Sequence, residues 1–221
     1  MLSGPVALRL TALGEFYAAA GAISSIPGWL HDAEGFALMT LAAHDEVRGA
    51  VVEIGSFKGR STCWLASGLK RRAASDPGAK PAAVHAIDHF TGSPEHRPEG
   101  THPDPDIAAH GSTLPAFRAN VARLGLGEFV EPVVSPSLAA AARWQGGPIR
   151  LLFIDGDHSY QASRADFHGW KPHLAPRALL CFHDVNGWEG VTRFYQELIA
   201  ANRSFTEVAA INSLRVVRMP G

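Results

Sequence analysis

Two short stretches of the sequence place acidic side chains directly after strongly apolar runs. Asp155 follows Leu-Leu-Phe-Ile at residues 151–154, and Asp184 follows Leu-Leu-Cys-Phe-His at residues 179–183. If both runs are neighbouring parallel strands, the two carboxylates meet at one edge of a sheet. They repel each other there unless a cation or a proton lies between them. The pair therefore predicts a site for a divalent cation.

His158 lies three residues after Asp155, at the start of a predicted helix. It should face the same edge of the sheet. An imidazole with an ordinary pKa of about 6.5 accepts a proton at neutral pH. His158 is therefore our candidate general base, and the alternative is a surface histidine. Its neighbours have simpler interpretations, because Asp157 and Ser159 can cap the helix and Tyr160 can pack against it.

A turn with two glycines, Glu-Ile-Gly-Ser-Phe-Lys-Gly-Arg-Ser at residues 53–61, joins a β-branched run to a helical stretch. Gly55 and Gly59 allow the backbone to approach a ligand closely, although tight strand-to-helix turns also use such glycines for structural reasons. The turn lacks the complete Gly-x-Gly-x-x-Gly pattern of dinucleotide sites. It therefore predicts a ligand without a pyrophosphate.

Asp88 ends the next apolar run along the chain. An acid at this position in doubly wound folds accepts hydrogen bonds from ribose hydroxyls. The alternative is an exposed aspartate that only begins a turn. Together with Glu53 and the glycine turn, Asp88 favours a ligand that carries a nucleoside.

These residues need a scaffold that brings the carboxyl ends of several strands together. Short apolar runs predict strands, and amphipathic stretches predict helices between them. Such alternation forms a parallel sheet covered on both faces, and two closely spaced final strands form a hairpin. We therefore expect an α/β fold, a Rossmann-like, doubly wound, mostly parallel seven-stranded sheet with an antiparallel C-terminal hairpin strand. The predicted strands are at about residues 50–54, 83–88, 129–134, 149–155, 178–183, 204–208 and 213–219, and the predicted helices at about 6–22, 32–47, 60–72, 113–124, 137–144, 159–174 and 188–201.

The length and composition fit one domain of this kind. The chain has 221 residues, of which 46% are hydrophobic, so it is not a disordered chain. We expect a single domain over residues 1–221, with N-terminal lid helices within residues 1–48. Residues 90–112, rich in proline and histidine, predict a long lid loop over the crevice, and the alternative is a disordered insertion.

Charge and cysteine content limit the partners and the compartment that we expect for the protein. The formal net charge is -1, which argues against a nucleic-acid or anionic-lipid partner. Cys63 and Cys181 lie in apolar segments, so we expect two core residues and a reducing compartment rather than a disulfide framework. The sequence predicts no signal peptide and no membrane span, and we expect a cytoplasmic protein.

Several motifs together resemble a known family. Residues 53–61, followed by Asp88, are similar to the first two motifs of class I S-adenosylmethionine-dependent methyltransferases. Residues 151–160 and 179–185 resemble methyltransferase family 24, a small-molecule O-methyltransferase branch related to catechol-type and macrolide-sugar enzymes. The resemblance covers about residues 26–219.

The resemblance implies a set of contacts with S-adenosyl-L-methionine. The glycine turn would hold the methionine part, with Ser61 capping the next helix or contacting the carboxylate. Asp88 would bind the ribose. Ser137 would contact the adenine or serve as an ordinary helix N-cap. The residues implied for the cofactor are Glu53, Gly55, Ser56, Gly59, Ser61, Asp88, Ser137 and Asp155.

The resemblance also implies a metal site at Asp155, His183 and Asp184. The related catechol-type and macrolide-sugar enzymes hold magnesium with oxygen ligands, but His183 stands where the first of two adjacent ligands is an acid. Imidazole suits manganese or zinc better than magnesium, so the choice among Mg, Mn and Zn stays open. The alternative for His183 is a strand-end imidazole that hydrogen-bonds a carboxylate.

The function implied is O-methylation of a small-molecule hydroxyl, on a sugar, a phenol or a natural-product intermediate. His158 would be the general base, with or without a divalent cation. One alternative is a non-catalytic adenosylmethionine-binding module. Another is an NAD(P)-dependent oxidoreductase, against which the incomplete glycine pattern argues. Asp88 also lies 35 residues after Glu53, where about 20 is usual for that class. Homo-oligomerisation is left open.

Overall fold

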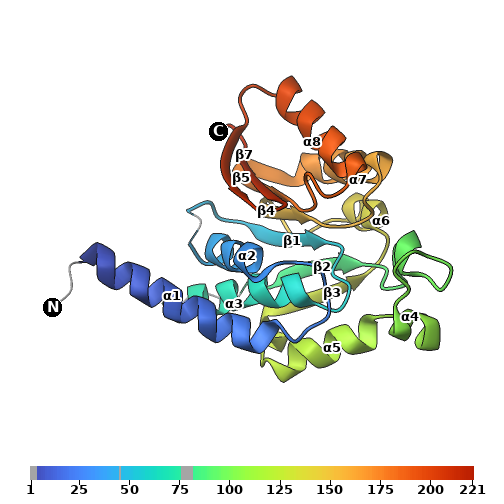
Figure 1. Ribbon diagram of the computed structural model, residues 1–221. Helices are drawn as coiled ribbons and strands as arrows, with labels where there is room; N and C mark the ends of the chain where they lie inside the picture. Colours follow the sequence, from blue (N-terminus) through green and yellow to red (C-terminus); the bar gives the residue numbers. More distant parts are fainter. Residues whose placement is uncertain (1–3, 45, 76–81) are drawn as a thin grey trace.

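A seven-stranded sheet organises the computed structural model, which describes residues 4–44, 46–75 and 82–221 (Figure 1). The strand order is β3-β2-β1-β4-β5-β7-β6. β1 to β5 pair in parallel, whereas β7 runs antiparallel to both β5 and β6. The predicted doubly wound sheet with a C-terminal hairpin is confirmed. The strands are β1 (Ala50–Ile54), β2 (Val84–Asp88), β3 (Val130–Val134), β4 (Ile149–Ile154), β5 (Leu174–Phe182), β6 (Thr206–Ile211) and β7 (Leu214–Arg218).

Helices cover both faces of this sheet. Residues of α1, α2, α3 and α5 pack in one apolar cluster, and residues of α6, α7 and α8 pack in another on the opposite face. In Figure 1, α1 projects away from the rest of the molecule at its N-terminal end. The α-helices are α1 (Gly4–Ile23), α2 (Asp32–His44), α3 (Arg60–Ser75), α4 (Pro105–His110), α5 (Leu114–Arg123), α6 (Ser137–Ala142), α7 (Tyr160–Trp170) and α8 (Glu189–Ala201), and the 3-10 helices are η1 (Pro94–His96), η2 (Gly127–Phe129) and η3 (Lys171–His173).

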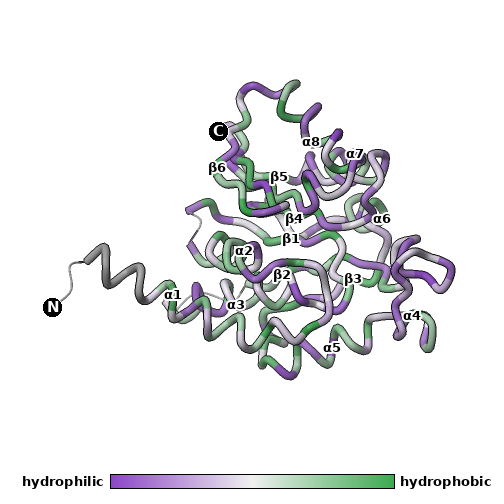
Figure 2. The backbone as a smooth tube through the Cα atoms, viewed as in Figure 1, coloured by the Kyte–Doolittle hydropathy of each residue, from purple (hydrophilic) through white to green (hydrophobic). Residues whose placement is uncertain are grey.

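β4 lies at the centre of the core, and all its residues are buried. Because successive side chains of a strand point to opposite faces, Leu151 and Phe153 join one apolar cluster while Leu152 and Ile154 join the other. Figure 2 shows the contrast between hydrophobic stretches in the sheet and the hydrophilic segment beside α4. The two predicted core cysteines, Cys63 and Cys181, are both fully buried.

Several predicted helices end earlier than their apolar pattern suggested, two of them by three residues or more. The helix expected over residues 159–174 stops at Trp170 and continues only as η3. Pro172 lies in this 3-10 turn, and a proline has no N–H group to continue an α-helix. The second helix ends at His44 rather than at Val47. Residues 1–3 and 45 of the predicted N-terminal helical segment lie outside the described residues.

The segment after β2, residues 90–112, is not a structureless loop as the sequence suggested. It contains η1 and the one-and-a-half-turn helix α4. The Asp104 side chain accepts hydrogen bonds from the N–H groups of Asp106 and Ile107 and so caps α4, and Gly111 ends it in a left-handed conformation. A six-residue helix is too short to show a periodic pattern, which is why the prediction missed it.

The N-terminal helices differ in position from the expected lid. Both pack against α3, and neither lines the cavity described below. The connection between them, residues 27–30, does line it. Among the described helices, none is long and apolar enough to span a bilayer.

Candidate active site

A cavity of about 680 Å³ opens at the carboxyl ends of β1, β2, β4 and β5. This is the edge at which doubly wound sheets bind ligands, and the volume lies within the range of about 300–1,000 Å³ found for small-molecule sites. The wall combines residues of the glycine turn, the strand ends, the segment after β2 and the connection between α1 and α2. The polar and aromatic residues of this lining include Trp29, Ser56, Phe57, Ser61, Asp88, Glu95, His96, Ser135, Ser137, Asp155, His158, Asp166, His183, Asp184 and Trp188.

The glycine turn between β1 and α3 forms one wall. Gly55 has a φ of 83°, and a Cβ on it would lie 2.0 Å from the Asp155 carbonyl oxygen. A Cβ on Gly59 would lie 3.0 Å from the Phe117 ring. The chain's own packing therefore requires both glycines. Gly55 lines the cavity, whereas Gly59 lies outside its lining residues.

Asp88, the predicted ribose ligand, holds the glycine turn in place. Its Oδ2 accepts hydrogen bonds of 2.8 Å from the backbone N–H groups of both Ser56 and Phe57, and its Oδ1 accepts one of 2.6 Å from Phe90. A carboxylate offers about four acceptor directions. Three are used within the chain, which leaves room for about one bond from a ligand hydroxyl.

Glu53 is fully buried behind this turn. Its Oε2 accepts hydrogen bonds from the hydroxyls of Ser56, at 2.8 Å, and of Thr62. Its Oε1 has no hydrogen-bond partner among the described residues. Burial raises the pKa of Glu53 to about 7, although the hydroxyls of Ser61, Thr62 and Ser56 act in the opposite direction. Glu53, predicted as a cofactor contact, is not among the residues that line the cavity, so its carboxyl lies behind the turn rather than at the open space.

Ser137, predicted as an adenine contact or an N-cap, begins α6 but makes no capping hydrogen bond. The N-cap interpretation is therefore wrong, because Pro136 occupies that position. The Ser137 hydroxyl accepts a hydrogen bond of 3.0 Å from the Trp170 indole N–H. It also contacts the buried side chain of Asp166, whose pKa burial raises to about 6. Ser137 and Asp166 line the same end of the cavity.

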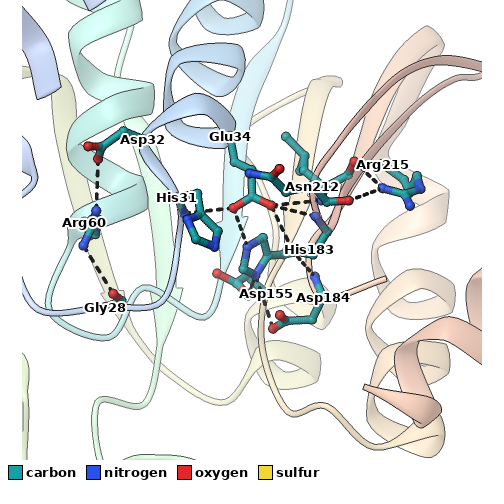
Figure 3. Close-up of polar contacts among 12 residues, drawn as sticks. Gly28, His31, Asp32, Glu34, Arg60, Asp155, His183, Asp184, Asn212 and Arg215 are labelled. Carbon is teal, nitrogen blue, oxygen red and sulfur yellow. Dashed lines mark hydrogen bonds and ion pairs between the residues drawn. The ribbon is translucent and has the colours of Figure 1, made fainter. Parts of the chain in front are cut away.

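Asp155 and Asp184 meet as their strand positions predicted, with His183 between them. The ring Nδ1 of His183 lies 2.9 Å from Asp155 Oδ1 and 3.2 Å from Asp184 Oδ2 (Figure 3). Burial lowers the pKa of His183, but contacts with Asp155, Asp184 and Glu34 outweigh it and raise that pKa far above its ordinary value. Burial raises the pKa of Asp184, but contacts with His158 and His183 outweigh it and hold that pKa well below its usual range.

His158 lies between two further carboxylates. Its Nδ1 is 2.8 Å from Glu95 Oε1, and its Nε2 is 3.0 Å from Asp184 Oδ2. Its ring stacks on the Trp188 indole, with the ring centroids 4.5 Å apart. Burial lowers the pKa of His158, but Asp184, Asp155 and Glu95 together raise it above its ordinary value. Both candidate imidazoles thus have carboxylates at each ring nitrogen.

Three of these side chains are arranged to hold a metal ion. One ligand atom from each of Asp155, His158 and Asp184 lies within 4.8 Å of the others. His183, which the sequence suggested as a ligand, is not in this group. Its nitrogens already face Asp155, Asp184 and Glu34. Carboxylate and imidazole donors in this combination suit Mn²⁺ or Zn²⁺ and are compatible with Mg²⁺.

A cluster of aromatic rings also lines the cavity. The Trp29 indole stacks on the His96 ring at 4.5 Å between centroids, and the Phe57 ring lies 5.3 Å from the same imidazole. Trp29 remains 57% exposed. The connection before α2, the glycine turn and the segment after β2 each supply one ring of this cluster.

Sequence reasoning missed Glu34 and Glu95. Glu34 lies in the first turn of α2, more than a hundred residues before Asp155 and Asp184, and Glu95 lies in the segment predicted as a loop. Both reach the site only through the tertiary fold. An acid in the first turn is ordinary for a helix N-terminus, and Asp32 is a second one in α2, so no local signal distinguishes Glu34.

Similar proteins agree with this architecture. A catechol O-methyltransferase of Mycobacterium tuberculosis is 28% identical over 151 residues, which make up 68% of this chain and 54% of that protein. An uncharacterised protein, y4gI, of Sinorhizobium fredii is 41% identical over 59 residues, 25% of this chain and 6% of that protein. The chain thus spans about half or less of the length of these curated relatives.

The fold is also that of a solved O-methyltransferase. The Bacillus cereus enzyme, determined in complex with SAH, superposes with a TM-score of 0.59 at 21% identity, covering 95% of this chain and 90% of that one. The family model described as a methyltransferase domain, family 24, matches residues 52–185, which run from β1 to just after the Asp184 carboxylate. This chain therefore belongs to methyltransferase family 24, within the class I S-adenosylmethionine-dependent methyltransferases.

Proposed function

We propose that the protein transfers a methyl group from S-adenosylmethionine to a hydroxyl of a small molecule. The observation that carries this proposal is a single cavity that joins two kinds of wall. One wall is the glycine turn with Asp88, and the other is the group of Asp155, His158 and Asp184. Donor and acceptor groups can thus meet without leaving one enclosed space.

The walls suit the donor. Asp88 lines the cavity and has room for a ribose hydroxyl. Ser137 and Asp166, which also line the cavity, offer polar atoms for an adenine. The mycobacterial relative is named as a catechol O-methyltransferase, and the Bacillus cereus enzyme was solved with SAH. Both fit the same ligand class.

His158 accepts the proton in this proposal. The sulfonium supplies the methyl group: its S–CH₃ bond breaks as the O–CH₃ bond forms, and S-adenosylhomocysteine leaves. His158 Nε2, which lies 3.0 Å from Asp184 Oδ2, would take the hydroxyl proton when the ring is neutral, with the remaining ring proton on Nδ1 toward Glu95. A positioned base contributes typically about 100-fold or more to such a step. The stacked Trp188 keeps the imidazole plane fixed.

A second candidate for the same residues is a divalent cation, because three donor atoms already converge. Asp155, His158 and Asp184 would hold it, and the bound ion would lower the pKa of the acceptor hydroxyl. His158 Nε2 cannot both coordinate an ion and accept a proton. Loss of activity on chelation therefore distinguishes this arrangement from the proton-acceptor role.

The segment of residues 90–112 acts as a lid in this proposal. Its α4 end is fixed to the glycine turn by Lys58, whose Nζ lies 2.7 Å from Asp104 and 2.6 Å from Asp106. Its η1 end carries Glu95 and His96 into the cavity. The lid and the Trp29 cluster would exclude water from the reacting atoms.

A methyl-transfer assay tests the proposal. The purified protein is incubated with S-adenosylmethionine carrying a CD₃ group and a panel of phenols, catechols and sugars, with mass spectrometry of the products. Labelled methyl ethers, formed together with S-adenosylhomocysteine, support the proposal. Binding of the donor with no transfer to any member would favour a non-catalytic module, and binding of NAD(P) in its place would favour an oxidoreductase.

A further inference from the structure

Glu34 is a fully buried carboxylate in the first turn of α2, outside the cavity lining. Its Oε1 accepts hydrogen bonds from the Ser213 N–H at 2.9 Å, from the Ser213 hydroxyl at 3.0 Å and from the Leu214 N–H at 3.2 Å. Its Oε2 accepts one of 2.9 Å from the His31 N–H. The carboxylate therefore ties the start of α2 to the turn between β6 and β7.

The same Oε2 also faces the site. It lies 3.2 Å from His183 Nε2, on the side of the ring opposite Asp155 and Asp184 (Figure 3). His183 is only 4% exposed. Its Nδ1 faces Asp155 and Asp184, so hydrogen bonding on both sides requires a proton on each ring nitrogen. The Glu34 carboxylate is thus the acceptor at Nε2 that fixes the ring in this orientation.

The contacts form a continuous series from α2 to the segment after β2. Glu34 contacts His183, His183 contacts Asp184, Asp184 contacts His158, and His158 contacts Glu95. Acids and imidazoles alternate at every step. A displacement of His183 would therefore release Asp155 and Asp184 and change what faces His158.

A purely structural role explains this arrangement less well. Burying a charged pair is costly, and well-packed apolar side chains often give equal or greater stability. The Glu34 carboxylate is also held by four donors besides His183. These four hydrogen bonds fix the position of the carboxylate that faces His183.

We propose that Glu34 is a positioning residue of the active site, which fixes His183 and through it the Asp155 and Asp184 carboxylates. This inference rests on the proposed function, since those carboxylates and His158 are the groups that act there. Glu34 itself does not line the cavity. Partners of this kind behind a site typically change metal affinity or activity by about 10- to 100-fold when they are replaced.

The test compares Glu34→Gln with Glu15→Gln. The first replacement keeps the shape but offers an N–H₂ or a neutral oxygen to His183. The second breaks an ion pair between α1 and Arg71 of α3, far from the cavity lining. Three quantities are measured for each: SAH affinity by calorimetry, Mn²⁺ affinity in the presence of SAH, and kcat with an acceptor from the methyl-transfer panel.

For Glu34→Gln we expect SAH affinity within about twofold of wild type and a decrease of about tenfold or more in kcat or Mn²⁺ affinity. Glu15→Gln should leave all three quantities nearly unchanged. If Glu34→Gln only destabilised the fold, SAH affinity would decrease together with kcat and Mn²⁺ affinity. Equal values for Glu34→Gln and wild type would overturn the inference.

Crystal structures of the wild type and Glu34→Gln test whether Glu34 positions His183, and they need neither an acceptor nor a metal. The inference requires His183 Nδ1 in the variant to move beyond about 3.5 Å from Asp155 or Asp184, and both contacts kept would contradict it. If Glu34→Gln does not fold, Glu34→Asp, whose shorter side chain keeps the charge, is used with the same criteria. Failure of wild type to bind SAH would instead refute the proposed function.

Discussion

Nδ1 of His158 lies 2.8 Å from Oε1 of Glu95. His158 follows β4, whereas Glu95 belongs to the segment after β2, so the contact joins the lid to the candidate base. The segment after β2 thus contributes an acid to the site. Whether His158 carries a proton depends on this contact and on Asp184 at the other ring nitrogen.

Replacing Glu95 by Gln should lower the pKa of His158 toward its ordinary value, because one of the acids that stabilise the protonated ring is lost. A protonated ring cannot accept a proton, so the acidic limb of the pH–rate profile should move to lower pH. Ring resonances of His158, followed by NMR titration, measure the pKa without an acceptor. The control is Glu99→Gln, an exposed acid of the same segment. An unchanged His158 pKa in Glu95→Gln would mean that the contact has no electrostatic effect.

His158→Ala should lower turnover by about 100-fold or more while leaving SAH affinity nearly unchanged, since the base acts on the acceptor and not on the donor. His168→Ala, on the exposed side of α7, is the matched control and should keep wild-type turnover. Steady-state kinetics and calorimetry measure the two effects. Near-wild-type turnover of His158→Ala would leave the ring only a structural or acceptor-positioning role.

Asp88→Ala should weaken SAH binding by roughly 1–3 kcal/mol and also destabilise the fold, because three backbone N–H groups lose a charged acceptor. Asp88→Asn retains one acceptor oxygen and should have smaller effects on both. Calorimetry and urea unfolding measure binding and stability separately. SAH affinity equal to wild type in a folded Asp88→Ala protein would remove Asp88 from the ribose site.

Chelation tests the cation. If Asp155, His158 and Asp184 hold a divalent ion in the active enzyme, exhaustive dialysis against EDTA should abolish turnover, and Mg²⁺, Mn²⁺ or Zn²⁺ should restore it. Asp184→Asn should require a higher concentration of the restoring ion, since one anionic ligand is lost. Full turnover after chelation, with no gain from any added ion, would exclude a catalytic metal and leave His158 as the proton acceptor.

The sequence predicted those parts of the fold that depend on local pattern. The apolar runs before Asp88, Asp155 and Asp184 predicted parallel strands, and the carboxyl ends of those strands do meet at the cavity. Short capped elements were missed, because α4 owes its ends to Asp104 and Gly111 rather than to periodicity.

The partners of each site residue could not be predicted in the same way. Glu34 reaches His183 across 149 positions of the chain, and Glu95 reaches His158 across 63. No local pattern encodes such pairs. The sequence indicated that His183 and His158 face one edge of the sheet. It did not indicate that Glu34, Asp155 and Asp184 would surround His183, or that His158 would join Asp155 and Asp184 in the group that could hold a metal ion.

Calorimetric titration of the purified protein with S-adenosylhomocysteine, and separately with NAD⁺, measures which nucleoside ligand the cavity binds. The product keeps the nucleoside and the amino acid of the donor, so it needs no acceptor and no metal to bind. We expect a saturable 1:1 isotherm with S-adenosylhomocysteine and no heat of binding with NAD⁺. Absence of S-adenosylhomocysteine binding by a correctly folded protein, or preferential binding of NAD⁺, would mean that the cavity does not hold a methyl donor.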